Sequence, residues 1–207
     1  MQTPEFIYFD LGKVLLEFSH DRMCSQMGEL VDLDAAATRA IVFDSGLSHG
    51  YETGEIDDAE FCELFFEKVG KKCEPADLLR AAGDIFSVKR QMTPLLAALA
   101  TCGIPLGILS NTCPVHWNTV TDGRFASLPA MFQKIVVSYE VGAMKPLAKI
   151  YEVAAETAGV EPARIFFVDD REDNIEGARA AGFDAHLFES PRQVQKLLME
   201  RGVCFNY

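Results

Sequence analysis

The chain has few basic residues for the number of its acidic ones, and it has no long hydrophobic run. Nineteen Lys and Arg stand against 31 Asp and Glu, which gives a net charge of −12. Such a surface repels phosphate backbones, so we expect no nucleic-acid partner. No apolar run approaches the roughly 18 residues that span a bilayer. The first residues, MQTPEF, lack the basic residues of a signal peptide. We therefore expect a cytoplasmic protein with no membrane partner.

Paired cysteine motifs are also missing. The six cysteines are Cys24, Cys62, Cys73, Cys102, Cys113 and Cys204, and they include no C-x-x-C pair and no regular spacing. This pattern argues against a zinc site and, without a secretory signal, favours reduced thiols.

Five short apolar runs are each followed by polar or turn residues. They are FIYF (6–9), IPLGILS (104–110), KIVVS (134–138), IFFVDD (165–170) and AHLFE (185–189). Nearly continuous apolar runs of this length are typical of strands buried on both faces. Helical patterns that end on glycine lie among the later runs, at 147–159, 174–182 and 191–202. This alternation predicts βαβ units and a parallel sheet.

Residues 19–90 interrupt the alternation. The segment contains helix-like stretches such as DDAEFCELFFEKVG and no convincing strand. We therefore predict an α/β fold with a Rossmann-like three-layer α/β/α core, formed by residues 1–18 and 91–207. A helical cap, residues 19–90, is expected to be inserted after the first strand.

Polar side chains follow the expected strands. In chain order they are Asp10, Ser110, Asn111, Thr112, Lys145, Asp169, Asp170, Asp173 and Asn174. Ligands of open α/β sheets bind at the carboxyl ends of the strands. We therefore expect these groups to converge on one crevice.

Three carboxylates in one crevice require cations. Unit charges about 4 Å apart at an effective dielectric of about 20 interact by about 4 kcal/mol. Asp10, Asp169 and Asp170 would repel by that order unless a cation intervenes or one of them keeps its proton. Lys145 supplies one cation, and a hard divalent metal with oxygen ligands, such as Mg²⁺, would supply another. Such a site would accept an anion.

The segments FDLGKVL, LSNT, MKP and FFVDDREDN, in this order, resemble the four motifs of the haloacid dehalogenase superfamily. The resemblance covers the whole chain, including a helical cap after the first motif. It is closest to the glucose-1-phosphate phosphatase-like and epoxide-hydrolase N-terminal-like branch. One such motif alone is weak evidence because an acid after a strand is common, whereas four in order are strong evidence.

The resemblance implies roles for individual residues. Asp10 would be the nucleophile and would form an aspartyl-phosphate that water hydrolyses, while Lys145 would neutralise charge in the transition state. The implied Mg²⁺ ligands are the Asp10 carboxylate, the Gly12 carbonyl and Asp170. The implied phosphate-binding residues are Ser110, Asn111 and Lys145, with Asp169 and Asn174 orienting ligands and metal-bound waters.

The sequence departs from the family pattern at Gly12. Most phosphatases of this superfamily carry a second Asp there, which protonates the leaving alcohol, and such a group commonly contributes about 10²–10⁴-fold in rate. The glycine favours a good leaving group, such as an anomeric phosphate, or a proton donor from elsewhere. His20 and His49 are candidate donors.

Two further positions stay open at this stage. Lys13 either enters the acidic cluster or is solvated. Tyr51 and Glu52, in GYETGEID (50–57), either face the site from the cap or only form a turn between helices.

The leading hypothesis is a Mg²⁺-dependent phosphatase that acts on a small phosphorylated metabolite, for example a sugar phosphate such as glucose 1-phosphate. A 2-haloacid dehalogenase, in which Asp10 would attack carbon without a metal, is disfavoured by the acidic pair at 169–170. A catalytically weakened member that binds a ligand or a partner protein is the third hypothesis, motivated by Gly12 and Lys13. No feature of the sequence predicts the natural substrate or the oligomeric state.

Overall fold

The computed structural model describes residues 2–125 and 131–205. Its main sheet has five parallel strands in the order β5-β4-β1-β6-β7. The strands are β1 (Phe6–Phe9), β4 (Leu106–Ser110), β5 (Lys134–Val137), β6 (Ile165–Asp169) and β7 (Asp184–Leu187). Each overlaps one of the five apolar runs, so the prediction of a parallel α/β sheet is confirmed.

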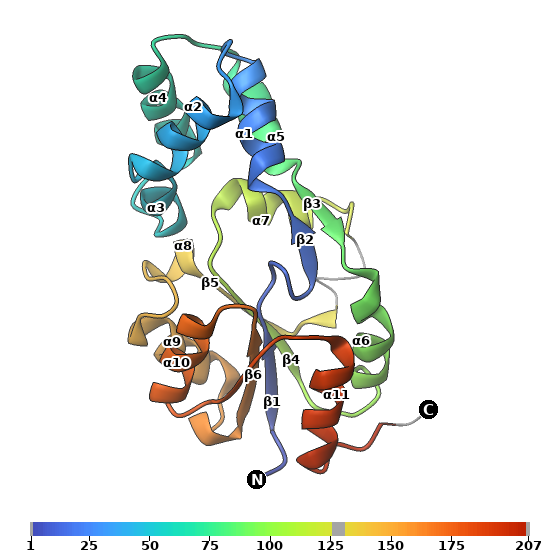
Figure 1. Cartoon of the computed structure of the whole chain (residues 1–207). Coiled ribbons are helices and arrows are strands. Elements are labelled where there is room, and N and C mark those ends of the chain that lie inside the picture. The colour runs from blue at the N-terminus through green and yellow to red at the C-terminus, as the bar shows by residue number, and fades with distance from the viewer. Residues whose placement is uncertain (1, 126–130, 206–207) are drawn as a thin grey trace.

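Helices cover both faces of this sheet (Figure 1). Side chains of the central strand β1 alternate between two hydrophobic clusters, as the period of a strand requires. Ile7 and Phe9 pack with α6 (Thr93–Leu99) and α11 (Pro191–Glu200). Phe6 and Tyr8 pack with α9 (Ala148–Ala158) and α10 (Glu172–Ala180). The result is the expected α/β/α sandwich.

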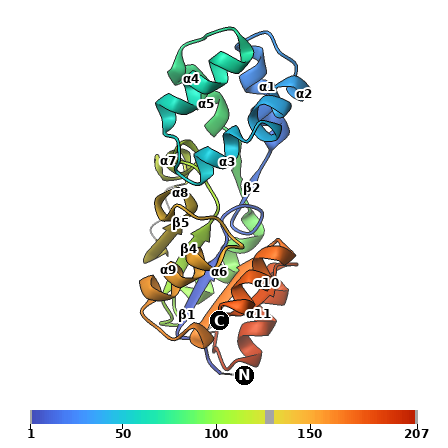
Figure 2. The ribbon, with the colours of Figure 1, turned by 90° about the vertical axis from the view of Figure 1, so that its left-hand side faces the viewer.

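A group of helices stands above the carboxyl ends of the strands (Figures 1 and 2). Its elements are α1 (His20–Glu29), α2 (Ala35–Arg39), the π-helix η1 (Ala40–Asp44), α3 (Leu47–Glu52), α4 (Asp58–Val69) and α5 (Pro75–Gly83). Their buried side chains, among them Met27 and Phe65, form a third cluster that reaches the core at Cys113 and Val115. We call this group of helices the cap.

Shorter elements complete the chain. They are η2 (Arg90–Met92), α7 (Pro114–Thr121), α8 (Ser138–Val141) and η4 (Pro162–Arg164). Of these, α7 and α8 follow β4 and β5 and face the cap (Figure 1). They form the surface of the core on which the cap stands.

The expectation of no strand within residues 19–90 is wrong at one place. Strands β2 (Leu16–Phe18) and β3 (Phe86–Val88) pair antiparallel, with Leu16 opposite Val88. Three residues are too few to show an alternating pattern, and the pairing partner lies about 70 residues away, so local sequence carried no signal for it. The cap is inserted between these two strands. The domain boundaries expected at residues 18 and 91 remain a proposal, which this pair of linkers supports.

Two further expectations concern membranes and thiols. No helix within the described residues has the length and apolar character needed to cross a membrane. All six cysteines are free thiols, and three of them are buried. The structure therefore contains no disulfide among these positions.

Candidate active site

The carboxyl ends of β1, β4 and β6 meet below the cap, and the side chains that follow them line one cavity of about 410 Å³. The expected site residues that line it are Asp10, Gly12, Ser110, Asn111, Lys145, Asp170 and Asn174. Asp169 is fully buried beneath them. The structure thus brings together groups that lie up to about 160 residues apart in the sequence.

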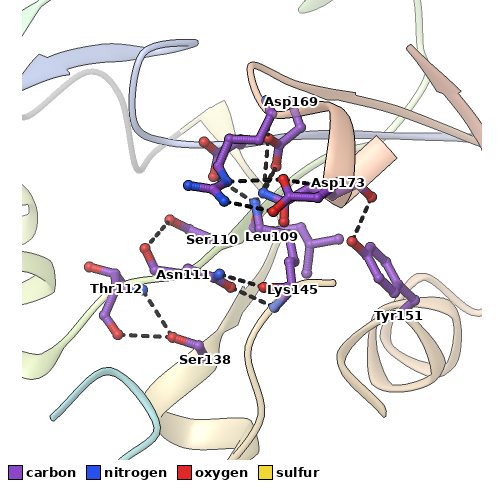
Figure 3. A network of polar contacts seen from close by, with 12 residues as sticks. Leu109, Ser110, Asn111, Thr112, Ser138, Lys145, Tyr151, Asp169 and Asp173 are labelled. Atoms are coloured by element: carbon purple, nitrogen blue, oxygen red, sulfur yellow. Dashed lines mark hydrogen bonds and ion pairs between the residues drawn. The ribbon is translucent and has the colours of Figure 1, made fainter. Parts of the chain in front are cut away.

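Lys145 is at the centre of the polar network (Figure 3). Its ammonium, in a residue only 4% exposed, donates to Asp10 Oδ1 at 2.8 Å, to the Leu109 carbonyl at 2.8 Å and to Asp169 Oδ2 at 2.6 Å. These contacts use all three of its N–H donors. Burial opposes the charge on Lys145, but the carboxylates of Asp10 and Asp169 outweigh it and raise its pKa. The lysine therefore stays protonated.

Asp169 serves Lys145 and the loop after β6. Its two oxygens accept from the Asn174 amide at 3.0 Å each, and Oδ1 also accepts from the Arg171 backbone N–H at 2.9 Å. Together with Lys145, these donors occupy the four acceptor positions of a carboxylate. Asp169 is therefore held in place by these donors and is an ion-pair partner of Lys145.

Asp10 and Asp170 share the remaining negative charge. Burial raises the pKa of Asp10 to about 7; Lys145 opposes that rise, and Asp169 and Asp170 add to it. Burial, followed by the charge of Asp169, also raises the pKa of Asp170. Oxygens of the three carboxylates lie within 4.8 Å of one another. One ammonium among three acids leaves an excess of negative charge at this end of the sheet.

The segment after β4 is tied to its neighbours. Asn111 binds the backbone of Lys145 in both directions, donating to its carbonyl at 2.9 Å and accepting from its N–H at 2.8 Å. Ser138 bridges the N–H and the carbonyl of Thr112. The Ser110 hydroxyl makes only a long bond, 3.3 Å, to the Asn111 carbonyl. Asn111 thus positions the Lys145 loop, and Ser110 is the hydroxyl best able to change partner.

Gly12 has a steric reason to be glycine. A Cβ at this position would lie 2.6 Å from the Phe18 ring, far inside van der Waals contact. Its carbonyl accepts from the Val14 N–H at 2.7 Å, which leaves one lone pair for another partner. The neighbouring Lys13 also lines the cavity, but its ammonium donates to the Phe18 carbonyl at 2.8 Å. Phe18, at the end of the first linker strand β2, thus packs its ring against Gly12 and binds the ammonium of Lys13 with its carbonyl.

The cavity also includes residues that the sequence analysis did not assign to the site. They include Phe18 and Phe86 from the linker strands, His116 from α7 and Arg171 from the loop after β6. Glu52, left open from the sequence, lines the cavity from the end of α3. Of these, Arg171 lies within a motif and His116 lies just past the LSNT segment, where packing and a place at the substrate mouth were both open from the sequence; Phe18 and Phe86 had no local signal.

The two histidines proposed as proton donors have different positions. His20 lines the cavity, where burial, followed by the charges of Arg39 and Lys13, lowers its pKa. His49 is exposed and does not line it. His116 is half-buried, with its Nε2 3.2 Å from the Ala82 carbonyl, and burial lowers its pKa to about 4. His20 and His116, which both line the cavity, are therefore neutral at neutral pH.

Comparison with known proteins is consistent with this geometry. Residues 28–182 match the model of the haloacid dehalogenase-like hydrolase family. The D-ribitol-5-phosphate phosphatase of Bacteroides thetaiotaomicron is 24% identical over 184 residues, which are 86% of this chain and 88% of that protein.

Two solved structures have the same fold. A HAD family enzyme of Bacteroides thetaiotaomicron, in complex with magnesium and inorganic phosphate, has a TM-score of 0.76 at 24% identity, covering 89% of this chain and 94% of that one. The L-2-haloacid dehalogenase of Xanthobacter autotrophicus has a TM-score of 0.65 at 19% identity, covering 99% of this chain and 85% of that one. With three quarters of its length matched by the family model and its four motif segments gathered at one cavity, the chain belongs to the haloacid dehalogenase-like hydrolases.

Proposed function

We propose that the protein is a Mg²⁺-dependent phosphatase that hydrolyses a small phosphorylated metabolite, with Asp10 as its nucleophile. The observation that carries the proposal is the charge balance of the site. Asp10, Asp169 and Asp170 converge on a cavity with one buried ammonium among them. Such a site has an excess of negative charge until a cation binds, and with the cation it would accept an anion such as a phosphate ester.

The donor set suits a hard divalent cation. Asp10 uses Oδ1 for Lys145, and the four acceptor positions of Asp169 are occupied. Asp10 Oδ2, the Asp170 carboxylate and the free lone pair of the Gly12 carbonyl remain as oxygen ligands, which Mg²⁺ prefers. Asn174 Oδ1 is buried and has no hydrogen-bond partner among the described residues, as expected where a metal-bound water would donate to it. When bound, Mg²⁺ would neutralise charge on the phosphoryl group.

The remaining steps belong to residues of the chain. The Asp10 carboxylate would attack phosphorus and form an aspartyl-phosphate, which water then hydrolyses. The Ser110 hydroxyl is free enough to donate to a phosphoryl oxygen. Lys145 favours the ionised form of Asp10 and would stabilise the developing negative charge, and Asn111 fixes the backbone from which Lys145 projects.

The relatives support a phosphate ester over a haloacid as substrate. A relative matched over 86% of this chain is named as a D-ribitol-5-phosphate phosphatase, whereas the dehalogenase shares only the fold. A dehalogenase needs no cation, so no bound cation in such an enzyme would offset the repulsion between the carboxylates of Asp10 and Asp170. The cavity of about 410 Å³ has room for a sugar phosphate, and glucose 1-phosphate, which has a good leaving group, is a substrate we propose to assay.

The test measures hydrolysis of para-nitrophenyl phosphate and glucose 1-phosphate with Mg²⁺ and with EDTA. We expect turnover with Mg²⁺, its loss in EDTA, and a fall of at least about 10³-fold in Asp10→Asn. The exposed cap acid Asp44 provides the control variant, Asp44→Asn, which should keep full activity. Halide release from a 2-haloacid without metal would instead support a dehalogenase, and no turnover of either class would support a ligand-binding role.

A further inference from the structure

The site as described lacks an acid that can protonate the leaving group. Gly12 has no side chain, and the Phe18 ring would have to move to admit one. We propose that the Glu52 carboxyl, presented by the cap to the cavity that holds Asp10, donates a proton to the leaving-group oxygen and takes a proton from the attacking water. This inference rests on the proposed phosphatase function and adds a catalytic residue to it.

Glu52 lies at the junction of core and cap. It is the last residue of α3 and lines the same cavity as Asp10, Ser110 and Lys145. It also lines a small, mainly apolar cavity between the cap and α7 of the core, together with His20 and His116. Glu52 therefore borders the cavity that holds the reacting groups and is partly shielded from solvent.

Contact with the core holds this end of α3 in place. Gly54, two residues after Glu52, has φ +74°, and a Cβ there would lie 2.2 Å from the Tyr139 carbonyl of α8. Only glycine permits both the left-handed conformation and so close an approach. The Thr53 N–H continues the helix by donating to the His49 carbonyl. The position of Glu52 over the cavity is thus fixed by backbone packing.

The other titratable groups of the cavity are unsuited to the task. His20 and His116 are neutral, and the Nε2 of His116 binds the Ala82 carbonyl. The exposed Asp173 is bound at 2.6 Å by Arg171, which lowers its pKa. Asp10 and Asp170 are assigned to attack and to the cation. Glu52 is the remaining carboxyl among the described residues that line the cavity.

The environment of Glu52 suits proton exchange near neutral pH. Burial raises its pKa to about 7, and the Arg171 guanidinium partly opposes that rise. Acids on the neighbouring helices are bound elsewhere: Asp58 of α4 accepts from Tyr51, and Glu140 of α8 accepts from Tyr139. A general acid works best when its pKa lies near the working pH.

The proposed steps balance as follows. An Asp10 oxygen forms a bond to phosphorus while the bond from phosphorus to the ester oxygen breaks, and that oxygen takes the Glu52 proton to leave as an alcohol. The Glu52 carboxylate then removes a proton from water as the water oxygen bonds to phosphorus. The bond from phosphorus to Asp10 breaks, which releases inorganic phosphate. Asp10 is then a carboxylate again, and Glu52 is again protonated.

The experiment compares the full-length protein with Glu52→Gln, which keeps the shape of the side chain but carries no acid. The substrates are para-nitrophenyl phosphate, whose leaving group needs little protonation, and glycerol phosphate, whose leaving group needs it. We expect kcat/KM of Glu52→Gln to fall by about 10²-fold or more with glycerol phosphate and by less than about tenfold with para-nitrophenyl phosphate. For glycerol phosphate, the unaltered chain should also lose kcat/KM as pH rises through about 7, and Glu52→Gln should lack this alkaline limb.

Two controls separate the possible failures. Glu55→Gln, at an exposed acid of the same loop, should leave both substrates and the pH profile unchanged. Equal losses with the two substrates in Glu52→Gln, or an unchanged alkaline limb, would overturn the role of Glu52 while the phosphatase stands. Absence of Mg²⁺-dependent turnover in the unaltered chain would overturn the proposed function and this inference with it.

Discussion

The core and the cap bury side chains of different kinds. At the strand ends of the core, Lys145, Asp10 and Asp169 are buried charges that satisfy one another through short hydrogen bonds. The cap interior is built from apolar side chains such as Phe61 and Phe65, with aromatic rings stacked on one another. A buried charge depends on each of its partners, whereas an apolar contact is one of many. We therefore expect stability and activity to be inseparable in the core site and separable in the cap.

Removal of Lys145 should have the largest effect of the substitutions proposed here. Lys145→Ala leaves Asp10 and Asp169 buried without a counter-charge, so the free energy of unfolding should fall by about 3–5 kcal/mol. Activity should fall by at least about 10²-fold. Urea unfolding and phosphatase assays measure the two effects. Lys149→Ala, at an exposed lysine of α9, is the control. If Lys145→Ala is as stable as the unaltered chain, the buried charges of Asp10 and Asp169 do not depend on Lys145.

Truncation of a buried ring in each region sharpens the comparison. Phe65 of the cap and Phe167 of β6 are both fully buried, so Phe65→Ala and Phe167→Ala should each cost about 3–5 kcal/mol. Hydrogen exchange should show the cap amides opening early in Phe65→Ala while amides of β1 stay protected. Equal loss of protection in both regions of that variant would mean that cap and core unfold as one unit.

An ion pair at the edge of the core should contribute less. Asp184 of β7 accepts from Arg201 at 2.8 Å and pairs with His186 at 2.7 Å. Burial opposes its ionisation, but these hydrogen bonds outweigh burial and hold the pKa of Asp184 well below its usual range. Asp184→Asn should therefore cost about 1.5–3 kcal/mol at neutral pH.

The pH dependence of that loss follows from its sign. A depressed pKa adds stability above the unfolded value of about 4 and loses it as pH falls through the folded value. The difference in unfolding free energy between Asp184→Asn and the unaltered chain should thus shrink below about pH 4. Glu189→Gln, at an exposed acid nearby, should show no such trend, and a difference that is constant with pH would contradict the assignment.

The smallest effect should come from single tyrosine hydroxyls. Tyr51 donates to Asp58 in the cap, and Tyr8 donates to the Ala154 carbonyl in the core at 3.0 Å. Each Tyr→Phe variant should lose about 1 kcal/mol, with the cap variant losing less because Asp58 is partly exposed and can bind water. Thermal unfolding measures both. Activity should stay within about twofold of the unaltered chain, and a larger loss in Tyr51→Phe would mean that the cap hydroxyl takes part in catalysis.

Much of the core site was predictable because its residues follow strands that can be recognised as buried from their apolar composition. Phe6 to Phe9 and Ile165 to Val168 are continuous apolar runs, so the acids after them had to lie at one edge of the sheet. The position of Lys145 near Asp10 followed from the same argument. What these residues bind in detail, such as the use of the Asn111 amide by the Lys145 backbone, depends on loop geometry that no spacing encodes.

The cap side of the cavity was less predictable. Helical periodicity shows which residues of α3 are apolar, but not which end of the helix meets the core. Glu52 faces the cavity because Gly54 lies against α8, a contact between segments about 85 residues apart. His116 and Phe86 entered the site in the same way, through packing across the interface. The strand β3 was missed because it has three residues and its partner, β2, lies about 70 residues away in the sequence.

The chain leaves the core along β2 and returns along β3, and these two strands are hydrogen-bonded neighbours. The chain therefore leaves and re-enters the core at one place, and the arrangement of the main sheet does not depend on the segment inserted there. A different set of helices spliced between Phe18 and Phe86 would stand over the same catalytic floor. Substrate range can therefore diversify, in evolution or in the laboratory, by exchange of the inserted helices while the charged residues of the core site stay the same.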